Sequence, residues 1–112
     1  MDRQNSQNTG YQALRHQKNV VSAIYAYCGP KFMTISILAN QFHVSENTIS
    51  NWFCEAVEKR YVASDAICYQ VMAKHIKEYE EKHLLVDSSL RTMYQLAFEA
   101  RGCPTPSIST TA

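Results

Sequence analysis

This chain of 112 residues lacks any apolar run near the about 20 residues that a membrane-crossing helix requires. Its first ten residues are polar and lack the apolar segment of a secretory signal peptide. We therefore expect a cytoplasmic protein with no membrane-spanning segment. The sequence also lacks alternating apolar and polar runs and Asn-Gly turns, so we expect no β-hairpin wing.

The patterns of most catalytic and metal sites are missing as well. No Gly-rich phosphate loop, paired-carboxylate site or nucleophile–base set stands at a recognisable spacing. None of the four cysteines forms a Cys-x-x-Cys pair, and His75 and His83 are separated by the wrong interval for shared metal ligation on a helix. We therefore expect no enzyme, no catalytic residue, no metal ligand and no cofactor.

A strong positive charge is also absent, since the net charge is only +1. Residues 1–45 contain four basic side chains and one acidic one, whereas residues 46–112 contain seven basic and nine acidic ones. Neutralisation of phosphates supplies much of the affinity for DNA, so a single copy is expected to bind DNA weakly. A homodimer that shares apolar surface of a fourth or fifth helix, or flanking helices that supply cations, would compensate, and the sequence leaves both open.

Residues 34–53 contain the most informative pattern. Two sets of apolar residues repeat at helical spacing, the first being Ile35, Leu38, Ala39 and Phe42, and the second Ile49, Trp52, Phe53, Ala56 and Val57. Thr34 and Ser45 precede these sets as helix N-caps. His43 stands at the corner, where a positive φ is expected and Gly is the usual residue. This pattern is typical of a helix-turn-helix, whose second helix enters the major groove of DNA.

If the apolar side of the second helix, about residues 46–60, faces inward, short polar side chains and Cys54 face outward. Asn can form two hydrogen bonds with adenine, and Ser can donate or accept one. We predict that bases are read by Glu46, Asn47, Ser50 and Asn51. We predict that the DNA backbone is contacted by Ser45, Thr48, Arg15, Lys18, Lys31 and Arg91. A packed helix pair with a solvated outer face would show the same pattern.

The whole chain predicts one all-α domain of about five helices around this central motif. The domain covers residues 11–102, between a disordered lead of residues 1–10 and a disordered, proline-containing tail of residues 103–112. The first helix, residues 11–28, is expected to end at Gly29-Pro30 and to bury Leu14, Val21, Ile24, Tyr25 and Cys28, with Val20 and Tyr27 broadening this stripe. The fourth begins at Ser64-Asp65, and its charged end, residues 77–83, predicts a solvated face. The fifth begins at residue 87 or 88 and ends at Gly102.

Residues 38–50, Leu-Ala-Asn-Gln-Phe-His-Val-Ser-Glu-Asn-Thr-Ile-Ser, resemble bacterial and phage helix-turn-helix regulators. The layout around them is most similar to the stage III sporulation protein D family, over about residues 12–100. That resemblance implies transcriptional control, with a recognition helix that reads bases and a C-terminal region that touches the DNA backbone. Its recognition-helix positions correspond to Ser45, Asn47, Thr48, Ser50 and Asn51. The strongly basic C-terminal segment of that family is missing here, where only Arg91 and Arg101 remain.

These observations predict a sequence-specific DNA-binding transcriptional regulator of bacterial or phage origin, with double-stranded DNA as its partner and a homodimer as its expected form. The alternative is a helical protein-interaction module, such as a phage-encoded inhibitor, that docks on a protein partner. The near-neutral charge and the seven tyrosines favour this alternative, because Tyr is enriched at protein interfaces.

Overall fold

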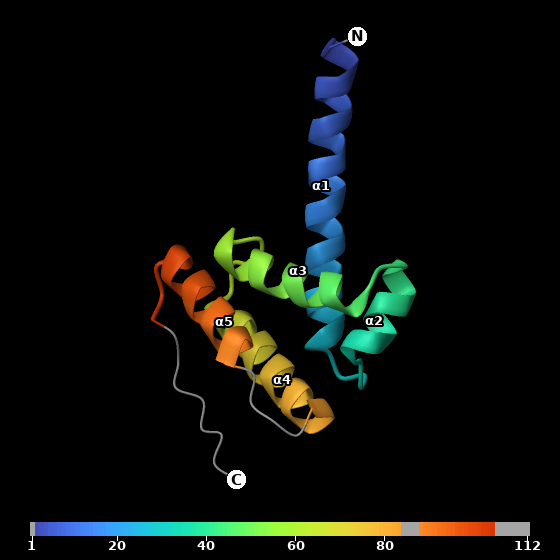
Figure 1. Cartoon of the computed structure of the whole chain (residues 1–112). Helices are drawn as coiled ribbons and strands as arrows, with labels where there is room; N and C mark the ends of the chain where they lie inside the picture. The colour runs from blue at the N-terminus through green and yellow to red at the C-terminus, as the bar shows by residue number, and fades with distance from the viewer. Residues whose placement is uncertain (1, 84–87, 105–112) are drawn as a thin grey trace.

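The chain folds into five α-helices in a computed structural model, which describes residues 2–83 and 88–104, with side chains described for residues 10–82 and 89–104 (Figure 1). The helices are α1 (Asp2–Tyr27), α2 (Ile35–Phe42), α3 (Glu46–Glu58), α4 (Asp65–His83) and α5 (Ser88–Arg101). The described ranges contain no strand, and the predicted all-α class is confirmed. None of the described helices is long and apolar enough to cross a membrane.

Helix α3 lies at the centre of the fold and contacts each of the other four helices (Figure 1). Its apolar side is fully buried, as the spacing of Ile49, Phe53 and Val57 predicts. The ring of Phe53 packs between Tyr27 of α1 and His75 of α4, at centroid distances of 4.7 and 5.5 Å. Burial of one such side chain contributes about 1.5–3 kcal/mol to the free energy of unfolding. Since α3 buries several of them among the other helices, it organises the core.

The connection between α2 and α3 is a tight turn with the predicted caps. Thr34 accepts a hydrogen bond from the backbone N–H of Ile37, and Ser45 accepts one from that of Thr48. His43 has a φ of 58°, in the left-handed region, as its corner position predicts. The backbone N–H of Val44 then reaches back to the carbonyl oxygen of Ala39 at 3.0 Å, which closes the end of α2.

Helix α3 ends at Glu58, before the end near residue 60 that the sequence predicts. Arg60 adopts a φ of 59°, so the chain folds back on the helix. The N–H of Tyr61 then bonds to the carbonyl oxygen of Ala56 at 3.0 Å. A left-handed residue that redirects the chain in this way is a common helix stop.

Helix α1 differs from its prediction at its start and in its buried face. It begins at Asp2 rather than after a disordered lead. Leu14 and Tyr25 were predicted in the core but are exposed, and Val21 and Cys28 are half-buried. Val20, Ile24 and Tyr27 are buried, as predicted, and Ala23, which was not predicted, is buried with them. Both sides of α1 are apolar, so spacing alone does not exclude Leu14 and Tyr25 from the core.

Helix α4 holds the segment between α1 and α2 through two charged side chains. The ammonium of Lys74 donates to the carbonyl oxygens of Tyr27 and Met33, at 2.7 and 2.9 Å. The carboxylate of Glu78 accepts from the hydroxyl of Tyr27 and from the N–H of Ile35, at the positive end of the α2 dipole. Glu78 lies in the run predicted as a solvated face, but it is half-buried because α2 begins beside it.

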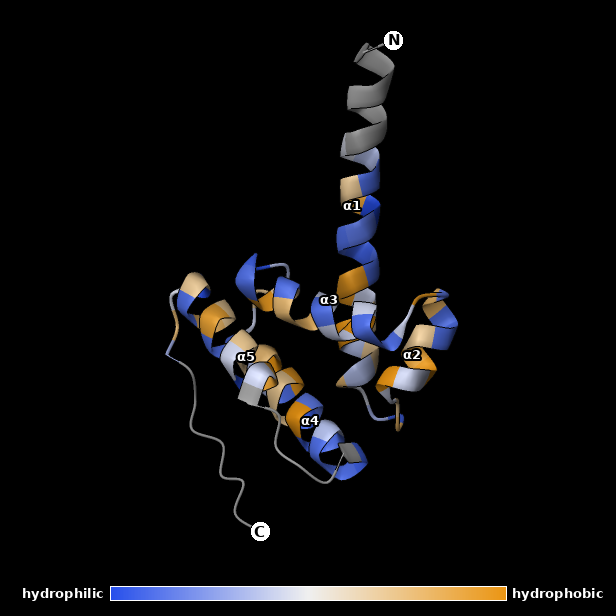
Figure 2. Ribbon diagram, viewed as in Figure 1, coloured by the Kyte–Doolittle hydropathy of each residue, from blue (hydrophilic) through white to orange (hydrophobic). Residues whose placement is uncertain are grey.

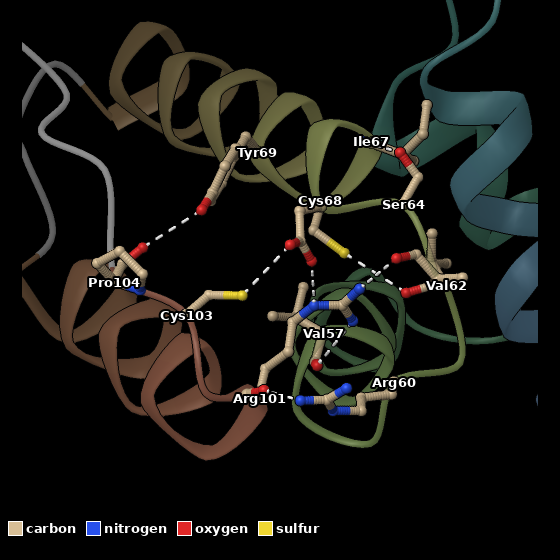
Figure 3. Close-up of polar contacts among 12 residues, drawn as sticks. Val57, Arg60, Val62, Ser64, Ile67, Cys68, Tyr69, Arg101, Cys103 and Pro104 are labelled. Carbon is tan, nitrogen blue, oxygen red and sulfur yellow. Dashed lines mark hydrogen bonds and ion pairs between the residues drawn. The ribbon is translucent and has the colours of Figure 1, made fainter.

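The end of α5 is fixed to α3 and α4 by a buried arginine (Figure 3). Arg101 is 3% exposed, and its guanidinium donates to Asp65 at 2.7 Å and to the carbonyl oxygen of Ala63 at 2.8 Å. Its own carbonyl oxygen accepts a hydrogen bond from Arg60. Arg101 therefore joins the end of α5 to the connection between α3 and α4.

The predicted disordered tail begins in an ordered contact. The thiol of Cys103 donates to Asp65 at 3.4 Å, and the carbonyl oxygen of Pro104 accepts from Tyr69 (Figure 3). These contacts exist because Gly102, with a φ of 88°, turns the chain back toward α4. The rest of the tail, residues 105–112, lies outside the described residues.

We expect Arg101→Ala to lower the free energy of unfolding by about 1–3 kcal/mol, because the buried carbonyl oxygens that it contacts lose a charged donor. Urea denaturation followed by circular dichroism measures this change. Lys82→Ala, which breaks a more exposed ion pair, is the matched control and should cost less. Equal losses for the two variants would contradict a structural role for Arg101.

Candidate nucleic-acid interface

The outward side of α3 is narrower than the sequence predicts. Asn47 and Asn51 are exposed and stand one helical turn apart, so both amide groups are presented to solvent on the same side. Ser50 and Cys54 are half-buried, although both were placed on the outward side. They lie toward α4 and α5, which cover that edge of α3. In place of a broad polar face, α3 therefore has a narrow exposed stripe that contains Asn47 and Asn51.

Ser50 is engaged by a buried hydrogen-bond chain. Its hydroxyl oxygen lies 3.1 Å from Nε2 of His75, and Nδ1 of His75 lies 2.6 Å from the hydroxyl oxygen of Tyr94. A neutral imidazole donates at one nitrogen and accepts at the other, so the ring can satisfy both hydroxyl groups. This chain connects α3, α4 and α5 at the side of the exposed stripe. Ser50 therefore helps to position α3 through its bond to His75.

The environment of His75 is unsuited to acid–base chemistry at neutral pH. The side chain is 1% exposed, and burial lowers the pKa of His75 to about 4. Its Nδ1 faces the hydroxyl of Tyr94 rather than a carboxylate that would stabilise a protonated ring. The Ser50–His75 pair therefore lacks the electrostatics of a serine nucleophile and its base.

Glu46 is also engaged, at the start of α3. Its carboxylate forms an ion pair with Lys82 of α4 at 2.6 Å, although both side chains are about half exposed. The pair borders a hollow of about 180 Å³ between α3 and α4, which Asn47, Ser50, His75 and Glu78 also line. The hollow has charged side chains of both signs at its walls and lies directly beside the exposed stripe.

The opposite edge of the stripe is closed by α1. His16 Nε2 lies 2.9 Å from the carboxylate of Glu55, and the His16 ring meets Trp52 edge-on at 5.8 Å. Burial acts to raise the pKa of Glu55, but hydrogen bonds from Tyr61 and His16 outweigh burial and lower this pKa. Glu55 is thus a charged, well-bonded group between α1 and α3. Cys54 behaves differently, because burial, followed by the nearby Glu58, raises the pKa of its thiol to about 12.

The predicted DNA-backbone contacts do not form one surface. Ser45 and Thr48 bond to each other and cap α3, with their hydroxyl oxygens 2.9 Å apart. Lys18 lies two residues after His16, so it projects about 200° around α1 from the side that contacts α3. The remaining candidates are the exposed cations Arg15 and Lys31, and the half-buried Arg91, which pairs with Glu80 at 3.0 Å.

The side chains that hold Ser50 and Glu46 come from α4. The local sequence pattern does not indicate that α4 packs beside α3. The position of His75 in an apolar stripe signals its burial, but its contact with Ser50 joins residues 25 positions apart. Lys82 likewise reaches Glu46 across 36 positions. Among the described residues, no group of three or more His, Cys, Asp or Glu side chains is arranged to hold a metal ion.

Comparisons with protein-family models, curated proteins and solved structures return no match to this chain.

We expect acid to destabilise the fold through His75. Its pKa is about 4 in the folded chain and 6.5 in the unfolded chain, so only the unfolded state gains a proton between these values. The free energy of unfolding should therefore fall by about 3 kcal/mol as the pH drops from 6.5 to 4, on top of any carboxylate contribution. Urea midpoints measured across this range give the slope.

His75→Gln should have a shallower slope than the unmodified chain, since the titrating ring is absent. His43→Asn is the control, because it removes an exposed histidine at a left-handed position that Asn tolerates. An unchanged slope in His75→Gln would rule out this histidine as the cause.

Proposed function

We propose that this protein is a sequence-specific DNA-binding regulator that inserts the N-terminal half of α3 into the major groove. The observation that carries the proposal is the pair of exposed amides, Asn47 and Asn51, on a helix held by α2 through a tight, doubly capped turn. A helix-turn-helix uses such a pair of helices to present one helix to DNA. The resemblance of residues 38–50 to bacterial and phage regulators supports the same interpretation.

In this proposal the base-reading residues are Asn47 and Asn51. An Asn side chain can donate its amide N–H to N7 of adenine and accept from the exocyclic N6 amine with its amide oxygen, which distinguishes adenine from the other bases. Ser50 and Glu46 act indirectly, because their contacts with His75 and Lys82 set the angle between α3 and α4. We therefore assign these two residues to positioning.

The charge around α3 predicts modest affinity for a single copy. Glu58 is exposed on the same side of α3 as Asn47 and Asn51, and its carboxylate repels phosphates. Lys82 is partly neutralised by Glu46. Arg15 and Lys31 are exposed and supply cations on other elements. Contacts with bases must therefore provide much of the discrimination between the target site and random DNA. Binding by two copies would raise the total affinity for DNA.

We expect Asn47→Ala and Asn51→Ala each to weaken binding by about 1–3 kcal/mol on a DNA site selected from a random duplex pool, and to change binding to random DNA little. Fluorescence anisotropy at fixed salt measures both affinities. Asn40→Ala is the matched control, because Asn40 is exposed on α2 rather than α3. Glu58→Gln should strengthen binding to both DNAs, since it removes a negative charge beside the groove.

Equal losses on selected and random DNA would show that the two amides do not read bases. Failure of the pool to yield any enriched sequence would refute the regulator proposal itself.

A second candidate is a protein-docking module, which a different region favours. Phe32 is 96% exposed at the edge of a groove of about 730 Å³ between residues 28–34 and α4. Exposed aromatic side chains beside an apolar groove are typical of protein interfaces. Salt separates the two functions: DNA binding weakens steeply as salt rises, whereas docking on an apolar groove does not.

A further inference from the structure

Helix α1 carries a second apolar stripe beside its core-facing side. The stripe consists of Tyr11, Leu14, Val21 and Tyr25 of α1 and of Cys28 directly after the helix end, with Lys18 at the remaining position. The intervals along it alternate between three and four residues, which is the spacing of a coiled-coil seam. His16 and Ala23, which face the interior, occupy the opposite side of the same heptads.

This stripe is largely open to solvent. Tyr11, Leu14 and Tyr25 are 69%, 64% and 51% exposed, and Val21 and Cys28 are half-buried against the core. Every side chain from residue 10 to residue 15 is exposed, so this part of α1 has no packing partner among the described residues. The projection of α1 beyond the other helices is clear in Figure 1, and Figure 2 shows one apolar patch on this otherwise mostly hydrophilic part of the helix.

An unpacked helical segment is marginal in water, and Gly10 weakens it further. A helix that continues past its last core contact while keeping an apolar stripe therefore indicates a partner. The spacing identifies the kind of partner, because a heptad seam packs against another helix with the same repeat.

We propose that this stripe of α1 binds α1 of a second copy of this chain, with the two helices antiparallel. In a parallel pair Lys18 would face Lys18 of the partner subunit, which places like charges side by side. In the antiparallel register Lys18 faces Val21 of the partner subunit, and Leu14 faces Tyr25 of the partner subunit. This arrangement also lays the projecting half of each helix on the supported half of the other.

The available area suits a reversible dimer. A buried aromatic side chain accounts for roughly 150–250 Å², so Tyr11 and Tyr25 at their exposed fractions offer roughly 200–300 Å² per chain. A standard interface takes about 800 Å² from each partner. Leu14, Val21 and the aliphatic stems of Arg15 and Lys18 add to the two tyrosines. We therefore expect a weak, reversible dimer.

The charge on α1 gives this dimer a distinctive response to salt. Between Tyr11 and Tyr27 the helix has two cations, Arg15 and Lys18, and no acidic residue. Two copies therefore repel each other electrostatically while their apolar stripes attract. Because salt screens the repulsion, dimerisation should strengthen as salt rises. DNA binding has the opposite dependence, so failure of one proposal can be distinguished from failure of the other.

Sedimentation equilibrium of the full chain, without DNA, tests the proposal. We expect a monomer–dimer equilibrium, and Leu14→Glu should raise the dissociation constant about tenfold or more because it places a carboxylate in the seam. Gln12→Glu, an exposed position off the stripe, is the control for the added charge on α1. Leu96→Glu tests the exposed apolar side of α5, the type of surface that the sequence favoured for dimerisation.

Loss of the dimer in Leu14→Glu alone supports the proposal. A chain that stays monomeric at high micromolar concentration and high salt would overturn it, and so would a dimer that Leu96→Glu dissociates and Leu14→Glu does not. Circular dichroism of each variant confirms that the fold is retained.

Cysteine cross-linking tests the direction of the helices. Chains with Leu14→Cys are mixed with chains with Tyr25→Cys, oxidised, and analysed by mass spectrometry of the linked peptides. Links between positions 14 and 25 support the antiparallel register. Links between two positions 14 would overturn that register, as would the absence of any link between the introduced cysteines.

Discussion

The structure depends on the burial of α3 among the other four helices. Ile49, Phe53 and Val57 face inward, and each neighbouring helix closes part of the helix surface. Little of the α3 surface therefore stays exposed to contact a ligand. The exposed stripe with Asn47 and Asn51 is what remains after α1 covers one edge and α4 with α5 covers the other. The same packing that fixes the angle of α3 thus limits what α3 can contact.

Buried polar side chains determine how this packing is arranged. His75 joins three helices through Ser50 and Tyr94, and Arg101 joins the end of α5 to the connection between α3 and α4. Groups of this kind stabilise one arrangement because a displaced neighbour would leave a buried donor or acceptor without a partner. The surface beside α3 is therefore held by groups that do not themselves reach a ligand.

Helix α1 has a different role on each side. Its inner side completes the core, whereas its outer side carries an apolar stripe in which Tyr11, Leu14 and Tyr25 are exposed. If the stripe pairs with a second copy, two α3 helices belong to one assembly, and the weak attraction of each for phosphates is doubled. The proposed dimer and the proposed DNA binding therefore support each other physically, although different residues carry them.

The sequence by itself determined the five helices, the caps Thr34 and Ser45, and the left-handed turn at His43, because these features depend on residues within a few positions of one another. Local spacing also identified the buried side of α3. Only the tertiary structure decided which apolar side of α1 enters the core, and that Ser50, Glu46 and Glu78 are held by partners from other helices. These outcomes depend on contacts between residues 25 to 51 positions apart, and local periodicity contains no information about which distant side chain will arrive.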